Sequence, residues 1–280
     1  MFLLGFSFGG WMPYLTPIFI SSNKEIHYLA IRNKMTVMKR LYFTFFIFLN
    51  IMVANTQAQK PEDTEVWEPV PEVVAPGYSY ASPPSDAIVL FSENHLDQWE
   101  NKNGEKVEWD IEGDIFTVKP RTGEIRTKEN FEDFQLHVEW RAPKVVKGDG
   151  QGRGNSGIFL QGKYEVQVLD SYDNPTYPNG QAGSIYKQHI PLVNAMHPPG
   201  EWNSYDIIYK APRFDNNGEL LSPAYVTVIH NGVLIQNHTE IKGGTVYVGQ
   251  PKYESHGPGP IILQDHGDPV SFRNIWIREL

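Results

Sequence analysis

Apolar and polar residues alternate over short stretches from about residue 87 to the C-terminus, with glycine, proline, asparagine and aspartate between the stretches. This period of two is typical of β-strands with one buried face, and helical periodicity is almost missing. The predicted strands lie at residues 87–91, 107–113, 115–119, 134–142, 156–162, 164–170, 201–211, 224–232, 233–241, 259–267 and 270–280. About ten strands separated by turns predict an all-β fold, an antiparallel jelly-roll β-sandwich.

A different pattern precedes the strands. Lys39 and Arg40 follow Met38, an apolar run extends from Leu41 to Ala54, and small residues before Gln59 offer a cleavage site. These three parts predict a secretory signal peptide at residues 38–58. We expect residues 1–37 to be an over-extended N-terminus, residues 59–86 a proline-rich leader, and residues 87–280 the jelly-roll domain that carries the site. Export is therefore expected, to a periplasm or the cell exterior, without stable membrane insertion after cleavage.

The charge of the expected mature chain limits its partners. Residues 59–280 hold 19 basic and 32 acidic residues, a net charge of −13, and there is no cysteine in the sequence. An acidic surface repels nucleic acid, so no nucleic-acid partner is expected. The histidines are scattered without the spacing of metal ligands, and we expect neither a metal nor a cofactor.

Three predicted strands each present a polar face. In residues 134–142, four polar side chains alternate with the apolar Leu136, Val138 and Trp140. Such a face is commonly the solvent side of a sheet. Its glutamine, histidine, glutamate and arginine side chains also suit a cleft that binds the hydroxyls of a sugar. We favour the cleft, formed by Gln135, His137, Glu139, Arg141, Glu165, Gln167, Gln264 and His266.

The run GRGNSG at residues 152–157 matches the G-x-G-x-x-G pattern of dinucleotide-binding loops. In those loops the glycines open a helix, whereas here a strand, a turn and a second strand follow. The glycines are more consistent with a tight turn that brings Asn155 and Ser156 to the rim of the polar cleft.

The segment at residues 171–200 contains no clear strand. It is rich in proline and glycine but also carries tyrosines and apolar residues, which argue against disorder. A loop of this length in a compact domain is usually functional. We expect it to form a wall or lid over the site.

Glu165, Gln167 and Asp170 match the spacing of the E-x-D-x-x-E motif that some retaining β-glucanases carry on one strand. Two carboxylates would then flank a glycosidic bond as nucleophile and acid. Strict alternation places Asp170 on the opposite face from Glu165, so this interpretation requires a β-bulge between them.

Three runs carry a resemblance to a known family: GRGNSGIFLQGKYEVQVLDSY, GEWNSYDI and GPIILQDHGDPVSFRNIWIREL. In this order they resemble the 3-keto-disaccharide hydrolase family over about residues 86–280. The resemblance implies a concanavalin A/laminin-G-like jelly roll, in agreement with the predicted strands. It also implies an enzyme that acts without a bound cofactor on a glycoside already oxidised to a ketone at C3. Loss of the C2 proton, elimination of the C1 group and addition of water give net hydrolysis.

The resemblance assigns roles to residues of the polar faces. Glu165 or His266 would be the base, Glu139 would be the partner acid or would orient His266, and Arg273 and Arg141 would stabilise the enolate oxygen. The expected substrate-binding residues are Asn155, Ser156, Gln167, Gln264, Asp170, Tyr172, Tyr186 and Trp202. Two other functions remain open on the sequence, a direct retaining glycoside hydrolase and a sugar-binding module without catalysis.

Overall fold

The computed structural model describes residues 22–53, 60–91 and 94–280. Residues 1–71 and 72–280 form two separate units. In the first unit, helix α1 spans Ser22–Val53 and the short 3-10 helix η1 spans Pro61–Thr64. Most of the predicted signal peptide falls within α1, whereas its expected cleavage site at Ala58 lies outside the described residues. None of the described helices is both long and apolar enough to cross a membrane.

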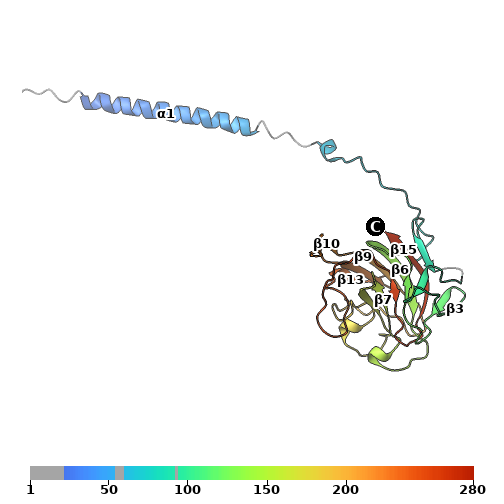
Figure 1. The fold of residues 1–280 in the computed structure, drawn as a ribbon. Helices are drawn as coiled ribbons and strands as arrows, with labels where there is room; N and C mark the ends of the chain where they lie inside the picture. The colour runs from blue at the N-terminus through green and yellow to red at the C-terminus, as the bar shows by residue number, and fades with distance from the viewer. Residues whose placement is uncertain (1–21, 54–59, 92–93) are drawn as a thin grey trace, which may run out of the picture. The chain divides into compact units, whose positions relative to one another are not determined.

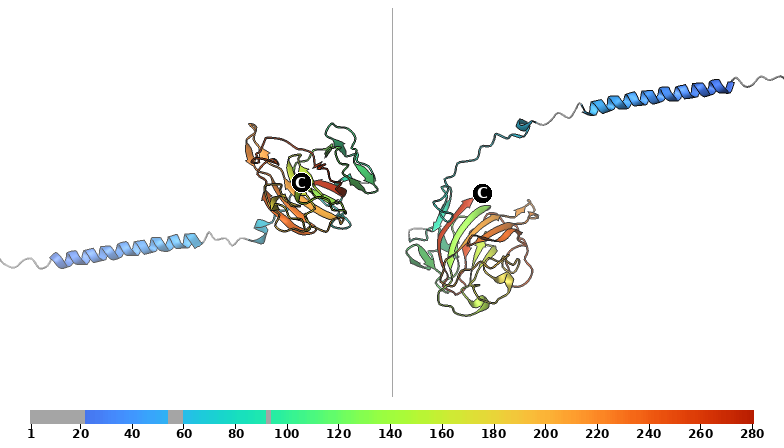
Figure 2. Two further views of the ribbon diagram at one scale, coloured as in Figure 1. Left: turned by 90° about the horizontal axis from the view of Figure 1, so that it is seen from below. Right: turned by 180° about the vertical axis from the view of Figure 1, so that it is seen from behind.

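The second unit is built from antiparallel sheets, as the alternation predicts (Figures 1 and 2). The larger sheet has the strand order β13-β12-β9-β6-β15-β4-β3, and β1 pairs with β15. Its strands are β1 Ile88–Phe91, β3 Asp110–Glu112, β4 Ile115–Thr117, β6 Phe134–Arg141, β9 Asn203–Lys210, β12 Tyr225–His230, β13 Val233–Glu240 and β15 Ser271–Glu279.

The smaller sheet has five strands in the order β2-β5-β14-β7-β8. They are β2 Trp99–Asn101, β5 Ile125–Thr127, β7 Ser156–Leu160, β8 Tyr164–Val168 and β14 Ile262–Leu263. A separate ribbon joins β10 Arg213–Phe214 to β11 Leu220–Ser222, and two 3-10 turns, η2 Gly150–Gly152 and η3 Pro178–Gly180, lie in loops.

The hydrophobic core lies between the two sheets. Leu136 and Val138 from the larger sheet and Ile158 and Val166 from the smaller sheet are fully buried in one cluster. Side chains alternate across a strand, so the intervening residues of β6 and of β8 point out of the sandwich on opposite sides. The predicted all-β antiparallel sandwich is confirmed.

The sequence predicts that the domain begins at Ala87. In the structure, residues before Ala87 also contact the sandwich. The carbonyl oxygen of Ala81 accepts hydrogen bonds from Asn274 Nδ2 at 2.8 Å and from Trp276 Nε1 at 3.0 Å. Asp86 forms an ion pair with Arg278. The last residues of the predicted leader are thus held against β15.

Candidate active site

Glu165 and Gln167 project from the outer face of the smaller sheet, the face directed away from the core. Glu165 lies opposite Phe159 and Gln167 lies opposite Gly157 in the antiparallel pair of β8 and β7. On the other side of β7, Ile262 lies opposite Phe159, and the backbone nitrogen of Gln264 donates to Gly157 O at 3.0 Å. Glu165 and Gln167 of β8 and Gln264 just after β14 therefore lie on one face, on either side of Gly157 and Phe159 of β7.

These side chains line a pocket of about 330 Å³. Its lining residues are Asn155, Phe159, Glu165, Gln167, Tyr186, Thr245, Tyr247, Gln264 and His266. The pocket combines one carboxylate, several amides and hydroxyls, and three aromatic rings. This composition can bind a sugar ring and exchange protons with it. Six of the residues predicted from the sequence meet here.

Glu165 is enclosed within this pocket, with 5% of its surface exposed. The opposite strand leaves room for it at Gly157, where an added Cβ would lie only 2.6 Å from Glu165 Oε1. The side-chain amide of Gln167 lies 2.9 Å from the same oxygen and donates to it when its nitrogen faces the carboxylate. Burial raises the pKa of Glu165 to about 8.

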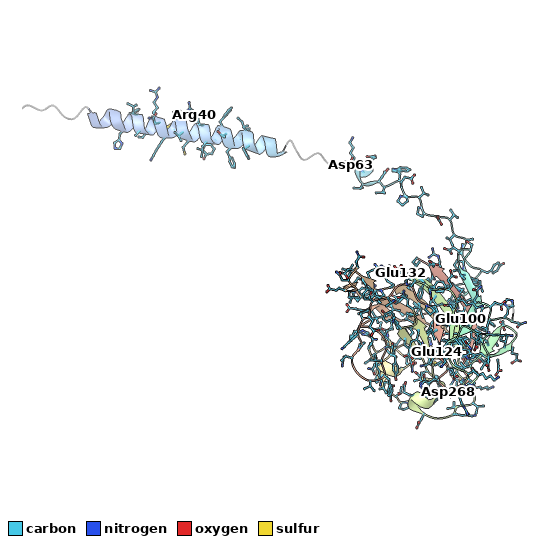
Figure 3. The ribbon with its side chains drawn as sticks, viewed as in Figure 1. Arg40, Asp63, Glu100, Glu124, Glu132 and Asp268 are labelled. Carbon is cyan, nitrogen blue, oxygen red and sulfur yellow. The ribbon has the colours of Figure 1, made fainter. Side chains whose placement is uncertain are left out.

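Asn155 stands at the rim and is fixed by two contacts. Its backbone nitrogen donates to Asp268 Oδ2 at 2.8 Å, and its Nδ2 donates to Gln151 O at 2.7 Å. Asp268 lies at the opposite end of the domain from Glu132 (Figure 3). The turn after η2 thus holds Asn155 beside Gln167, as the glycine-rich run predicts.

The long segment at residues 171–200 contributes one wall of the pocket, through Tyr186. Ile185 forms a β-bridge with Val166, and the backbone nitrogen of Tyr186 donates to Glu165 O at 3.2 Å, so the segment covers the edge of β8. The hydroxyl groups of Tyr186 and Tyr177 are hydrogen-bonded at 2.8 Å. Burial and this neighbouring tyrosine raise the pKa of Tyr186, which therefore keeps its proton at neutral pH.

Sequence reasoning missed three residues of the pocket. Phe159 could have been found, because it alternates with the buried Ile158 on a predicted strand. Thr245 and Tyr247 lie in a stretch without periodicity that approaches β8, where the backbone nitrogen of Glu165 donates to Thr245 Oγ1 at 2.9 Å. The sequence carries no local signal for that approach.

The prediction that one polar face holds all the candidates was wrong. Glu139 and Arg273 lie opposite each other on β6 and β15 and form an ion pair on the outer face of the larger sheet. Arg141 and Trp202 lie beside them, with the Arg141 guanidinium carbon 4.5 Å from the centre of the indole ring. The core separates this face from Glu165, so Glu139 does not orient His266, and neither arginine faces the Glu165 pocket.

Ser156 and Asp170 also lie outside the pocket lining. Ser156 is fully buried and donates its hydroxyl to Gln264 O at 2.7 Å, a contact between neighbouring strands. Asp170 is buried and accepts from Arg153 Nε at 2.7 Å. Tyr172 follows Asp170 on the surface and does not line the pocket either. Asp170 is therefore not a second carboxylate beside Glu165, as the glucanase-like spacing would require.

His266 lines the open side of the pocket and is exposed to solvent. Gln264 is deeper, and its Oε1 atom is buried without a hydrogen-bond partner. Among the residues that the structure describes, no group of three or more histidine, aspartate or glutamate side chains is arranged to hold a metal ion.

Comparisons with known proteins agree with this architecture. The family model described as "3-keto-alpha-glucoside-1,2-lyase-like domain" matches residues 86–278. The 3-keto-disaccharide hydrolase of Bacteroides thetaiotaomicron is 28% identical over 204 residues, which cover 56% of this chain and 62% of that protein. This chain thus spans less than two thirds of that relative's length.

Two solved structures from Parabacteroides distasonis, each described as a candidate glycosyl hydrolase, are similar in fold. One is 56% identical with a TM-score of 0.77, and the match covers 81% of this chain and 99% of that one. The other is 22% identical with a TM-score of 0.53, covers 70% of this chain and 94% of that one, and supports the fold alone. With the match over residues 86–278, the chain belongs to the 3-keto-alpha-glucoside-1,2-lyase-like domain family.

Proposed function

We propose that this protein cleaves glycosides whose sugar carries a ketone at C3, by elimination across C1 and C2 followed by addition of water. Membership of the family and the name of the curated relative support this substrate class. The single observation that carries the proposal is Glu165, a buried carboxylate with a raised pKa in a pocket rich in amides and hydroxyls.

Glu165 is the proposed base. A proton-transfer group works best when its pKa lies near the working pH, and burial brings the pKa of Glu165 to about 8. No lysine or arginine lines the pocket among the described residues, so the carboxylate is not neutralised by a fixed cation. A C3 ketone acidifies the C2 proton, which makes a carboxylate strong enough for the abstraction.

Tyr186 and Gln264 are the proposed partners of the substrate oxygens. The hydroxyl of Tyr186 keeps its proton and donates a hydrogen bond to the enolate oxygen that forms at C3. This replaces the two arginines expected from the sequence, which lie on the other sheet. The unpartnered Oε1 of Gln264 is an acceptor for a sugar hydroxyl, because a buried oxygen without a donor is costly.

The protons and electrons of the reaction balance without a cofactor. Glu165 takes the C2 proton, and the C–H electrons form the enolate. The enolate then forms the C1–C2 double bond as the C1–O bond breaks, and the leaving oxygen receives a proton. Water adds to C1 and C2 regains a proton, which restores the ketone. His266, at the open side of the pocket, is the proposed donor to the leaving group.

Direct retaining hydrolysis fits the pocket less well. That mechanism needs two carboxyl groups about 5 to 5.5 Å apart. Glu165 is the one carboxylate that lines the pocket in the described part of the chain. A sugar-binding module without catalysis would not require a buried acid with a shifted pKa.

The test offers the purified protein two matched disaccharides that differ in the C3 ketone alone. We expect cleavage of the keto form, a loss of about a hundredfold or more in Glu165→Gln, and a smaller loss in His266→Ala. Equal cleavage of the unoxidised disaccharide would refute the keto-sugar substrate. Cleavage of neither disaccharide would favour the binding module.

A further inference from the structure

A second pocket lies on the outer face of the larger sheet, across the core from Glu165. Its volume is about 210 Å³, and its lining includes Glu139, Trp202, Ser204, Asn231 and Arg273. It is smaller than the pockets of about 300 to 1,000 Å³ that hold drug-sized ligands, so it suits a single sugar ring. The Glu165 pocket shares none of its residues.

Arg273 lines this pocket, and Arg141 packs beside it on the same lining residue, Trp202. The guanidinium carbons of Arg273 and Arg141 lie 4.1 Å and 4.5 Å from the centre of the Trp202 ring. Arg273 donates to Glu139 through Nε alone, which leaves its two terminal nitrogens without a protein partner in the described part of the chain. The side chain of Arg141 has no hydrogen bond or ion pair with any described residue, and its contact is with the Trp202 ring. Carboxylates pair with four other arginines, Arg126, Arg153, Arg213 and Arg278.

The carboxylates on this face already have hydrogen-bond partners within the protein. Glu139 accepts from Arg273 and from Asn274 Nδ2, and Asp206 Oδ1 lies 2.6 Å from His137 Nδ1. Burial alone would raise the pKa of Glu139, but the nearby His137 ring and hydrogen bonds from Asn274 and Arg273 lower it to about 2. Burial would lower the pKa of His137, but its hydrogen bond with Asp206 and the nearby carboxylate of Glu139 raise it. Of these groups, Glu139 and Arg273 line the pocket, and their ion pair leaves the terminal nitrogens of Arg273 for a ligand.

We propose that this pocket is a second binding site, which takes a carboxylate-bearing sugar such as a uronic acid. The planar guanidinium groups of Arg141 and Arg273 match the geometry of a carboxylate. The hydroxyl of Ser204, which has no protein partner among the described residues, is available to the sugar hydroxyls. Asn231 shapes the wall beside it, with its side-chain amide bonded to Ser204 N, Ala195 O and Asn203 Oδ1. Residues 59–280 have a net charge of −13, so an anion is drawn to this face by these local donors rather than by the whole protein.

The test titrates the ¹⁵N-labelled protein with glucuronate and follows backbone amide shifts by NMR. We expect shifts at Trp202 and Ser204, with binding that weakens as salt is added. Arg141→Gln should weaken glucuronate binding about tenfold, and Ser204→Ala should weaken it less. Arg121→Gln, which removes the same charge from an exposed turn, is the matched control and should bind as the wild type does. Glu165→Gln should also bind normally, which separates this site from the catalytic proposal.

Glucose, acetate and inorganic phosphate are the comparison ligands. Glucose should bind more weakly because it lacks the charge, and acetate because it lacks the ring. Equal binding of glucose would overturn the role of the arginines, and equal binding of acetate or phosphate would overturn the role of the sugar. An unchanged affinity in a folded Arg141→Gln protein, or an absence of shifts at Trp202 and Ser204, would reject the site.

Discussion

Glu165 links stability to pH because its carboxyl group is nearly enclosed. Its pKa is raised from 4.5 to about 8 by burial, so the folded state holds a proton that the unfolded chain releases. The stabilisation is therefore complete below about pH 4.5, falls as pH rises toward 8 and is constant above that.

The wild type should lose about 4 kcal/mol of stability between pH 4.5 and 8 relative to Glu165→Gln, because the amide does not ionise. Urea denaturation of both proteins across this range measures the difference. If the free energies of unfolding of the two proteins change with pH in parallel, the carboxyl group of Glu165 is not held in the neutral form.

Gly157 leaves space for the side chain of Glu165, and Gly152 in the same glycine-rich run does not. A Cβ at Gly157 would lie 2.6 Å from Glu165 Oε1, whereas a Cβ at Gly152 would have nothing within 4 Å. Gly157→Ala should displace the carboxylate and lower kcat at least tenfold while the protein stays folded, because a side-chain tip can move.

Gly152→Ala is the matched control for this prediction and should retain activity. Steady-state kinetics and circular dichroism of both variants make the comparison. Full activity in Gly157→Ala would show that the position of Glu165 does not depend on this gap.

At the scale of elements, the ion pair between Arg153 and Asp170 ties the turn before β7 to the end of β8. Asp170 is buried and also accepts from the backbone nitrogen of Tyr172, so it anchors the start of the long wall segment. Asp170→Asn leaves a largely buried arginine without its counter-charge, which typically costs several kcal/mol.

We expect Asp170→Asn to lower the free energy of unfolding by about 3 kcal/mol and to leave the pH profile of kcat unchanged. Asp173→Asn, at the exposed position directly after Tyr172, should change neither. Denaturant titration measures a structural role of Asp170, and steady-state kinetics measure a catalytic one. Loss of kcat without loss of stability would return Asp170 to the catalytic candidates.

At the scale of the whole molecule, the segment before β1 belongs with the sandwich. Ala81 O satisfies two side-chain donors of β15, and Asp86 pairs with Arg278. A chain that starts at Glu72 should melt at the same temperature as the full chain. One that starts at Ala87 should melt about 5 °C or more lower, because buried donors lose their partner. Calorimetry measures both, and equal melting temperatures would show that the segment is not required.

Alternation along single strands predicted the sandwich and the inward and outward sides of β6 and β8. Glu165 and Gln167 do line one pocket with Gln264 and His266, because β8 and β14 flank β7 in one sheet. Alternation could not place Glu139, since it says which way a side chain points within a strand but not which sheet the strand joins. Thr245 and Tyr247 were beyond sequence reasoning, because their position depends on how an irregular segment packs.

In the proposed mechanism Glu165 removes the C2 proton of a 3-keto glycoside. The most direct measurement is deuterium incorporation at C2 when the reaction runs in D₂O, corrected for exchange without enzyme. The product should carry deuterium at C2, and Glu165→Gln should incorporate none above the uncatalysed rate. A product released by the wild type with its original C2 proton intact would rule out this role of Glu165.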